Sequence, residues 1–483
     1  MIIAAPRAFG QCVGPARKHS DTMSSLSRRS FLAASAAFAA APALGAVPYG
    51  SDVDVVIIGA GAAGIAAARR VAAANRRFAL IEAGNRIGGR CVTDTKIFGV
   101  PYDLGAHWMH NPDSNPLVAA AAKSGFDVYP APRTQTVRVG PRSARDSELE
   151  NFLASVLRSH RAIADAGKAK ADMAAVRALP RDLFDWQATV EFILGPFGAS
   201  KDLKEISAMD LARAIERDSD AFCRQGYGAL LAKLATGLDV QLSTPVQRID
   251  WSRGLEIETT KGRLRARAAI VTVSTNVLTA NKIEFSPALP KRQLDAAAKL
   301  SLGSYDHIAL DMPGNPLNLQ RDDMVFEQSA GTRTAALLAN ISGSGLHLVE
   351  IGGQFGRELA VKGEAAMVEF ARDWLASLFG ANVKRAIKRS HATRWNDEPF
   401  VLGAMSAAAP GNADARKILM EPIGGRIWFA GEAVHETQPG TVAGAWESGT
   451  RAAEGALRKM GGLKEPDENK PARRRRRRHN EDE

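Results

Sequence analysis

The chain has 483 residues, of which 45% are hydrophobic and 24% charged, and its formal net charge is +11. This length predicts two or three domains, and the composition is typical of globular chains that bury substantial cores. The sequence excludes a membrane-spanning helix in the mature chain, because no apolar run reaches the roughly 18 to 20 residues that such a helix needs.

Residues 1–46 are predicted to be a targeting segment rather than part of the fold. Arg28 and Arg29 precede a weakly hydrophobic, alanine-rich stretch, and small residues up to Ala46 offer a cleavage site. This arrangement resembles a twin-arginine export signal, which implies recognition by the twin-arginine export machinery and a periplasmic or otherwise exported location. A short basic, alanine-rich helix is the alternative interpretation, and Met23 is a second candidate for the true start.

Residues 461–483 are predicted to be a disordered, arginine-rich tail in which Arg473 to Arg478 form an unbroken run. Five basic and one acidic residue lie in 1–46, and eight basic and six acidic residues lie from Lys464 onward, which leaves a mild charge of about +5 for the body. The arginine run could hold phosphates. No recognition helix, aromatic platform or zinc spacing accompanies it, so we do not expect a nucleic-acid partner.

A glycine-rich motif, Gly59-Ala60-Gly61-Ala62-Ala63-Gly64, is the strongest functional signal in the chain. Residues 53–58 before it are typical of a buried parallel strand, residues 65–74 after it of a helix, and residues 78–81 of a second strand that ends at Glu82. The glycine spacing alone is a weak signal. A strand, a helix and an acidic residue in this order together predict a Rossmann-type dinucleotide site.

Each residue type in this motif has a physical task. Gly59 permits the tight turn, Gly61 lets the backbone approach a pyrophosphate, and Gly64 lets the helix pack closely on the strand. The helix N-terminus offers free N–H groups to the phosphates. Glu82 can accept hydrogen bonds from both adenosine ribose hydroxyls and would repel a 2′-phosphate, which argues against NADP. The alternative is a glycine turn that binds nothing.

The segment after this motif narrows the prediction. It reads Glu82-Ala83-Gly84-Asn85-Arg86-Ile87-Gly88-Gly89-Arg90, and Tyr102-Asp103-Leu104-Gly105-Ala106-His107-Trp108 follows. Both stretches resemble motifs of the FAD-dependent amine oxidase family. The resemblance implies an FAD cofactor, with Ala83, Gly89 and Arg90 beside its phosphates or flavin, and with Gly105, Ala106, His107 and Trp108 beside the isoalloxazine ring.

Residues 112–224 show helical periodicity and few strand signals, with helices predicted at 148–164, 168–179 and 203–215. We expect this region to begin a substrate-binding domain. After Gly228 the chain is predicted to form a helix to Ala235 and then a small β meander, with strands at 240–242, 244–249, 255–259, 263–266 and 269–273. In the family that the chain resembles, the position of Val246 meets the adenine through its backbone.

A second substrate-binding segment is predicted to hold strands at 305–312, 334–340 and 346–352 and a helix at 364–378. In the amine oxidase family a lysine commonly lies on the first of these strands and holds a water near flavin N5. His307 occupies that position here. A histidine can still hydrogen-bond the water, but with an ordinary pKa near 6.5 it would change charge at working pH. The plainer interpretation is a strand histidine with a backbone partner.

The C-terminal part of the chain favours flavin rather than nicotinamide. Residues 427–432 are typical of a strand ending in Gly431-Glu432, and residues 440–449 of a loop that opens a long helix. By resemblance, Gly431 and Glu432 approach the ribityl and pyrophosphate groups. Thr441 and Val442 would lie at the helix N-terminus beside the N1/O2 edge of the flavin, where the helix dipole would stabilise a reduced, anionic flavin.

Departures from the family pattern restrict the substrate prediction. In some members the segment corresponding to 395–411 carries a flavin-linking cysteine; no cysteine is present here, so FAD should be bound noncovalently. Two aromatic rings often flank the substrate nitrogen in monoamine oxidases, but the matching positions hold Met405 and Thr441. Trp395 is either a wall of the substrate site or a core residue.

Cysteine usage gives no disulfide framework, because Cys12 would leave with the export signal. Cys91 and Cys223 then remain. A bridge between them is one interpretation, but isolated cysteines are more often small buried hydrophobes. No metal site is predicted.

The predicted fold class is α/β, with a Rossmann-like FAD-binding domain that is discontinuous in sequence and an α+β substrate-binding domain. The FAD-binding domain is assigned residues 50–130, 225–282 and 389–460. The substrate-binding domain is assigned residues 131–224 and 283–388.

The predicted activity is oxidation of a small-molecule amine to an imine and then an aldehyde, with hydride transfer to flavin N5 and reduction of O2 to H2O2. His307, Trp395 and Thr441 are the candidate catalytic residues, and orientation beside the flavin would supply much of the rate enhancement. Two alternatives stay open: a flavin dehydrogenase or desaturase acting on a non-amine substrate, and a non-catalytic, FAD-stabilised binding protein.

Overall fold

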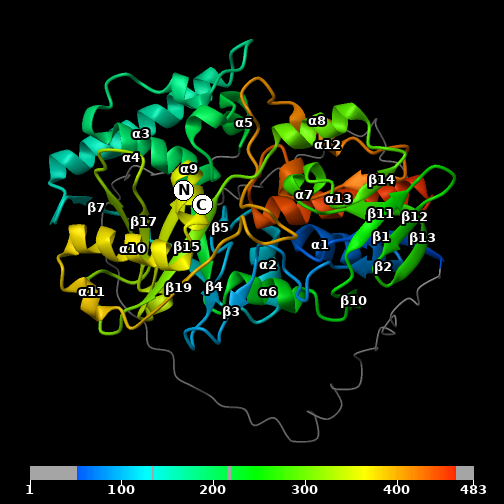
Figure 1. The fold of residues 1–483 in the computed structure, drawn as a ribbon, viewed down its shortest axis with the longest axis horizontal. Coiled ribbons are helices and arrows are strands. Elements are labelled where there is room, and N and C mark those ends of the chain that lie inside the picture. The colour runs from blue at the N-terminus through cyan, green and yellow to red at the C-terminus, as the bar shows by residue number, and fades with distance from the viewer. Residues whose placement is uncertain (1–51, 133–134, 215–218, 464–483) are drawn as a thin grey trace, which may run out of the picture.

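The computed structural model describes residues 52–132, 135–214 and 219–463. Two β-sheets form two neighbouring lobes in Figure 1, one of eight strands and one of seven, each with helices packed against it. The predicted export signal and the arginine run of the tail lie outside the described residues. Among the residues that are described, no helix has both the length and the apolar character needed to cross a membrane.

The first sheet is built around β1 (Asp52–Ile58), the strand before the glycine motif. Its order is β10-β2-β1-β13-β12-β11-β14, and β20 also pairs with β13. The other strands are β2 (Phe78–Ile81), β10 (Val240–Gln241), β11 (Val246–Asp250), β12 (Glu256–Thr259), β13 (Gly262–Val271), β14 (Glu284–Ser286) and β20 (Ile427–Phe429). The strands β10, β2, β1, β13 and β20 run parallel, whereas β11, β12 and β13 form an antiparallel meander. This mixed sheet confirms the predicted fold class.

One strand prediction in this sheet was wrong. Residues 263–266 and 269–273 were expected to be two strands, but β13 is continuous from Gly262 to Val271. It stays in register with β1 from the pair Asp52↔Arg265 to the pair Ile58↔Val271. Its first half also pairs with β12 and its second half with β20, so each half of the strand is held from a second side.

Helices cover both faces of the first sheet, which is why its central strands are almost entirely apolar. Val55 and Ile57 of β1 face a core shared with α1 and α13, whereas Val56 and Ile58 face a core shared with α7, α8 and α12. These helices are α1 (Ala62–Ala72), α7 (Thr275–Thr279), α8 (Lys291–Lys299), α12 (Ala415–Met420) and α13 (Val442–Lys459). The sequence predicted both α1 and α13.

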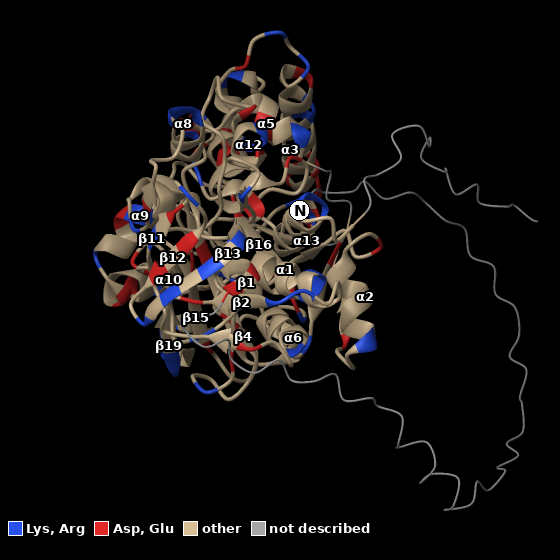
Figure 2. Ribbon diagram, turned by 90° about the vertical axis from the view of Figure 1, so that its right-hand side faces the viewer, with Lys and Arg blue, Asp and Glu red and all other residues tan. Residues whose placement is uncertain are grey.

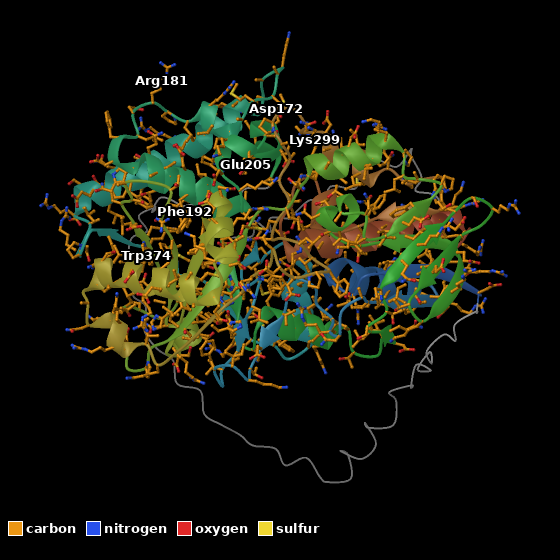
Figure 3. The ribbon with its side chains drawn as sticks, in the orientation of Figure 1. Asp172, Arg181, Phe192, Glu205, Lys299 and Trp374 are labelled. Atoms are coloured by element: carbon orange, nitrogen blue, oxygen red, sulfur yellow. The ribbon has the colours of Figure 1, made fainter. Side chains whose placement is uncertain are left out.

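The second sheet has the order β19-β15-β18-β17-β16-β7-β8. Its strands are β7 (Gln135–Val139), β8 (Arg142–Ser143), β15 (Tyr305–Asp311), β16 (Asp323–Glu327), β17 (Ala336–Ala339), β18 (Leu346–Gly352) and β19 (Arg389–Ala392). One face packs against α9 (Gly353–Val361), α10 (Glu364–Phe379) and α11 (Val383–Ala386), and the other against α3 (Asp146–Ala166) and α4 (Gln187–Phe192). Trp374 and Phe192, labelled in Figure 3, belong to these two helical layers.

Short elements connect the two lobes. They are β3 (Thr93–Asp94), β4 (Tyr102–Asp103), β5 (Met109–His110), α2 (Pro116–Lys123), β6 (Val128–Pro130), β9 (Asp220–Cys223) and α6 (Tyr227–Leu234). β5, β9 and β6 form a three-stranded sheet, and β3 pairs with β4. Cys91 and Cys223 are both free and buried here, so the interpretation as small buried hydrophobes is confirmed.

The helices predicted between the two sheets were only partly correct. The helix at 148–164 is confirmed as α3, but 168–179 is a loop with one short 3₁₀ helix, η1 (Ala175–Ala178). The Asp172 carboxylate accepts hydrogen bonds from the backbone N–H groups of Met173, Met209 and Gly411. The bonds from Met209 and Gly411 hold this segment against residues far away in sequence, and a regular helix does not form. Figure 3 labels Asp172 near the top of the molecule and Glu205 below it.

The predicted helix at 203–215 is likewise broken into η4 (Leu203–Glu205) and α5 (Ala208–Arg213). Ser207 separates them, because its hydroxyl accepts a hydrogen bond from the Asp210 backbone and so caps a new helix. The backbone N–H of Ser207 donates to Ala408, which lies in the C-terminal part of the chain.

Strand pairing does not follow two of the expected domain limits. β14 pairs with β11 in the first sheet, although the substrate-binding domain was expected to resume at residue 283. β19 pairs with β15 in the second sheet, although residues from 389 onward were assigned to the FAD-binding domain. Both strands lie at the edges of their sheets. Which sheet such a strand joins depends on its contacts with residues far away in sequence, and the local sequence pattern does not show those contacts.

Along the ribbon in Figure 2, positions of basic and acidic residues alternate, and β11, β12 and β13 lie together. Arg263 of β13 forms ion pairs with Glu256 and Glu258 of β12, each at 3.3 Å. The basic residues of this sheet are therefore balanced by acidic neighbours rather than gathered in one basic stripe.

Candidate active site

A cavity of about 750 Å³ lies where the two lobes meet. One end is lined by the glycine turn after β1 and by the end of β2. The other end reaches the helical layer and β15 of the second lobe. The groups of the first lobe include Gly59, Gly61, Glu82, Val246 and Gly431, and those of the second lobe include Ile193, Phe197, Tyr305 and His307.

The glycine turn has the geometry that its sequence predicts. Gly59 has φ +105°, and a Cβ there would lie under 3.0 Å from the Thr272 hydroxyl. Gly61 is the N-cap residue of α1 and lines the cavity, so the N-terminus of that helix faces the space. Gly64 does not line the cavity; a Cβ there would fall 1.8 Å from the Gly59 carbonyl oxygen. Its task is therefore close packing of α1 on the turn.

Glu82 lies at the cavity end of β2 with its carboxylate held by the backbone. The N–H of Ala60 donates to Oε2 at 2.7 Å and the N–H of Gly84 donates to Oε1 at 2.8 Å. Ala60 itself is fully buried and does not line the cavity, whereas Ala62, Ala63 and Ala83 do. Each carboxylate oxygen keeps a second lone pair, so Glu82 can still accept two hydroxyl groups.

We expect Glu82→Gln to weaken FAD binding about ten- to a hundredfold, roughly 1.5 to 3 kcal/mol. In the wild-type protein each oxygen of the carboxylate accepts a backbone N–H. The glutamine amide replaces one of these oxygens with an N–H donor, so one of the two hydrogen bonds is lost. Titration of FAD into cofactor-free protein, followed by flavin fluorescence, measures the change. Glu258→Gln on β12 is the matched control, because Glu258 lies outside the cavity lining. Equal affinities in the two variants would contradict the role of Glu82.

Arg90 and Glu432 form an ion pair at the cavity wall. Arg90 Nη1 donates to Glu432 Oε1 at 2.9 Å and also to the carbonyl oxygen of Ala404. The Glu432 carboxylate further accepts the Ser406 hydroxyl at 2.7 Å and the Gly440 N–H at 2.9 Å. Sequence resemblance assigns Glu432 to the ribityl or pyrophosphate region. In the structure the carboxylate of Glu432 accepts hydrogen bonds from protein groups, so it holds Arg90 and the neighbouring loops in place.

A buried arginine behind this pair was not predicted. Arg416 is only 2% exposed and forms a two-point contact with Asp210 at 2.7 and 2.8 Å. It also donates to the Ser406 hydroxyl at 3.0 Å and to the Ala433 carbonyl at 3.0 Å. Asp210 belongs to α5 and Arg416 to α12, so the pair ties the helical layer to the loops that carry Glu432. No local sequence signal joins two residues this far apart.

The segment from Gly105 to Trp108 lines the cavity, and its place beside an isoalloxazine ring stays a prediction. A Cβ at Gly105 would lie under 3.0 Å from the Arg90 carbonyl and 2.9 Å from the Trp395 ring, so only glycine fits there. Trp395 Nε1 donates to the Leu104 carbonyl at 3.0 Å. Trp395 is 5% exposed and also lines the cavity, so it is at once a wall and a packed core residue.

Asp103 organises the floor beneath this segment, a role that was not predicted. Its Oδ2 binds Nδ1 of His107 at 2.8 Å and accepts the backbone N–H of Tyr227 at 3.1 Å. Nε2 of His107 is buried and has no hydrogen-bond partner among the described residues. The ring of His107 stacks on Phe222, with ring centroids 4.6 Å apart.

His307 lines the cavity from β15 and is 3% exposed. Its Nδ1 donates to the Asp103 carbonyl oxygen at 3.0 Å, so the backbone partner of the plainer interpretation is present. Burial lowers the pKa of His307 to about 4. The expectation that it changes charge at working pH was therefore wrong for the substrate-free protein, because desolvation disfavours the imidazolium and the ring is neutral there.

The predicted aromatic-cage positions lack aromatic rings but do line the cavity. Met405, Thr441 and Val442 all face it. The Thr441 hydroxyl accepts the Gly444 N–H at 2.9 Å and donates to the Gln438 carbonyl at 2.9 Å, so it caps α13. Phe197 and Tyr305 supply aromatic surface instead. Tyr305 was missed, although it lies two residues before His307 on β15 and so shares its face of the sheet.

The lining fits a flavin dinucleotide. Close-packed glycines and a helix N-terminus lie beside an anchored carboxylate at one end, and flat aromatic and histidine surfaces lie at the other. Among the described residues, no group of three or more His, Cys, Asp or Glu side chains is arranged to hold a metal ion.

A sequence model of the flavin-containing amine oxidoreductase family matches residues 62–457. The chain belongs to this family. Human lysine-specific histone demethylase 2 is 27% identical over 434 residues, which cover 83% of this chain and 53% of the demethylase. Polyamine oxidase 3 of Oryza sativa subsp. japonica is 27% identical over 453 residues, which cover 84% of this chain and 91% of that protein. The chain thus spans about half the length of some of the curated relatives that it matches.

Solved structures confirm the amine oxidoreductase fold. Cyclohexylamine oxidase from Brevibacterium oxydans IH-35A superposes with a TM-score of 0.72 at 21% identity, covering 85% of this chain and 100% of that one. Putrescine oxidase bound to putrescine gives a TM-score of 0.71 at 19% identity, covering 84% of this chain and 99% of that one.

Proposed function

We propose that this protein is an FAD-dependent amine oxidase. The observation that carries the proposal is one continuous cavity that joins the glycine turn and Glu82 to a wall of Trp395, Tyr305 and His307, in a chain of the flavin-containing amine oxidoreductase family. The polyamine, cyclohexylamine and putrescine oxidases among its relatives and structural neighbours support a small-molecule amine as the substrate.

When bound, FAD would accept a hydride equivalent at N5 from the carbon beside the substrate nitrogen and pass the electrons to O2, which yields H2O2. The chain supplies position and environment. Glu82 and the α1 N-terminus hold the dinucleotide end, while Trp395 and Tyr305 exclude water and orient the substrate. The neutral imidazole of His307 presents a hydrogen-bonding group to the cavity.

Binding of FAD is proposed to be noncovalent. The segment 395–411 holds no cysteine, and Cys91 is the one free thiol among the described cavity-lining residues. Burial raises the pKa of the Cys91 thiol well above its usual range, so it stays protonated and is a poor nucleophile. Acid precipitation of the holoprotein should therefore release all of the FAD into the supernatant.

Oxygen uptake with a panel of monoamines, polyamines and amino acids tests the activity, with peroxide and aldehyde measured together. The proposal predicts one peroxide per aldehyde for at least one amine class. Because Met405 and Thr441 stand where an aromatic cage is expected, a flavin dehydrogenase or desaturase is the second candidate. Flavin reduction by a non-amine substrate, with no amine oxidised, would favour that candidate.

His307→Ala should slow reoxidation of the reduced flavin by oxygen much more than it weakens substrate binding, and His307→Lys should restore reoxidation. The reason is that both histidine and lysine can order a water beside the flavin, whereas alanine cannot. Stopped-flow mixing of reduced protein with oxygenated buffer measures the rate. Equal reoxidation rates in wild type and both variants would refute this role of His307.

We also propose export by the twin-arginine route to the periplasm, on the basis of Arg28, Arg29 and the alanine-rich stretch that follows. Fractionation of the native cells tests this location. Recovery of full-length protein in the cytoplasmic fraction alone would refute it.

A further inference from the structure

A buried carboxyl group lies directly behind His307. Glu350 of β18 is the cross-strand partner of His307 in the antiparallel pair β15–β18, so both side chains project from the same face of the sheet. Glu350 Oε1 lies 3.5 Å from His307 Nε2, and Glu350 is 0% exposed.

Neither oxygen of Glu350 makes a hydrogen bond of good geometry among the residues that the structure describes, although His307 Nε2, the Tyr305 hydroxyl and the Trp108 indole N–H lie beside it. An unpartnered buried carboxyl group costs free energy, and such groups concentrate at functional sites. Burial raises the pKa of Glu350 to about 7, while the nearby Tyr305 hydroxyl, His107 and the Trp108 indole N–H act in the opposite direction. The group can therefore hold or release a proton near neutral pH.

The position of the hydrogen on His307 follows from its other contact. The Asp103 carbonyl oxygen can only accept, so Nδ1 of His307 carries the hydrogen and Nε2 of the neutral ring carries the lone pair. His307 lines the cavity and Glu350 does not. Glu350 therefore acts on the cavity contents through the side chains in front of it, of which His307 places its Nε2 3.5 Å from the Glu350 carboxyl group.

We propose that Glu350 is a positioning residue that balances the charge when His307 removes a proton from the substrate ammonium group. One N–H bond of the ammonium breaks, its electron pair stays on the amine nitrogen, and a new N–H bond forms at Nε2. The positive charge moves from the substrate to the imidazolium, beside the Glu350 carboxylate. The amine is then neutral, as loss of a hydride equivalent from the neighbouring carbon requires.

This inference rests on the proposed amine oxidase function and explains a difficulty in it. Because burial lowers the pKa of His307 to about 4, the imidazole alone is a weak base for an ammonium ion. An adjacent carboxylate in a buried site favours the charged imidazolium. The other ionisable groups facing the pair are Tyr305 of β15, Asp103 of β4 and His107. Asp103 is paired with His107 at 2.8 Å, and burial keeps Tyr305 protonated.

Glu350→Gln tests the proposal, because it keeps the shape of the side chain and removes the charge. We expect kcat for the best amine to fall more than tenfold at pH 7 and to recover toward the wild-type value near pH 10, where the substrate arrives already neutral. Glu327→Gln is the matched control: Glu327 lies on β16 of the same sheet and outside the cavity lining, with Trp374 Nε1 donating to its carboxylate at 2.6 Å. Its pH profile should match the wild type.

Infrared difference spectra give a readout independent of turnover. Between pH 5 and pH 9 the wild-type protein should lose a protonated-carboxyl band that is missing from E350Q. A wild-type pH profile in E350Q overturns the proposal while leaving the oxidase function intact. Wild-type protein that oxidises no amine overturns the proposed function instead. Should E350Q fail to fold, H307Q decides: a profile like the wild type overturns the proposal, and loss at pH 7 with recovery at high pH supports it.

Discussion

Gly64→Ala should weaken FAD binding severely. A Cβ at this position would fall 1.8 Å from the Gly59 carbonyl oxygen and 2.9 Å from its carbonyl carbon, and both are rigid backbone atoms. The clash pushes α1 away from the turn and displaces its N-terminus from the cavity. Overpacking typically costs about 1 to 3 kcal/mol, and where no flexible side chain can yield we expect at least about a hundredfold loss of affinity.

FAD titration of cofactor-free protein measures this effect, with circular dichroism as a check on folding. Gly331→Ala is the matched control, because no atom lies within 4 Å of the added Cβ and Gly331 does not have a left-handed φ. It should bind FAD like the wild type. Wild-type affinity in Gly64→Ala would show that the turn does not set the position of the helix.

Arg416→Ala should destabilise the fold by about 3 to 5 kcal/mol, because it leaves the Asp210 carboxylate buried without its counter-charge. Asp210 is 2% exposed, and Arg416 supplies a contact to each of its oxygens, while the only other donor to the carboxylate among the described residues is the Ala408 backbone N–H at 2.9 Å. The Ser406 and Ala433 carbonyls lose donors as well. The loss should appear as a lower denaturant midpoint and a lower thermal midpoint.

Lys417→Ala supplies the control from the next position of α12. Its ammonium is exposed and lies 3.6 Å from Glu436, so we expect a change within about 0.5 kcal/mol. Replacing both buried partners, as Arg416→Met with Asp210→Leu, should recover much of the loss. A destabilisation of Arg416→Ala no larger than that of Lys417→Ala would contradict the account.

Local pattern was sufficient to predict the strand, turn, helix and acidic residue that form the end of the cavity proposed to hold the nucleotide. β1, the glycine turn, α1 and Glu82 lie within about thirty consecutive residues, and each residue type has a task that short-range geometry defines. The family resemblance then placed Arg90, Gly105 and Trp395 on the same cavity. These predictions needed no knowledge of how distant segments meet.

Predictions failed where contacts with residues far away in sequence determine the local structure. Residues 168–179 have helical periodicity, yet Asp172 is held by backbone donors from Met209 and Gly411. His307 has an ordinary histidine sequence context, but burial lowers its pKa, although its contacts with Asp103 act in the opposite direction. No sequence spacing could pair His307 with Glu350, because that contact depends on the register of β15 against β18.

Anaerobic addition of amines to the purified holoprotein tests the central claim most directly. If the cavity holds FAD beside an amine site, at least one amine class will bleach the flavin absorbance, and readmitted air will restore it with release of peroxide. A flavin that dithionite reduces but that no monoamine, polyamine or amino acid bleaches would contradict the account.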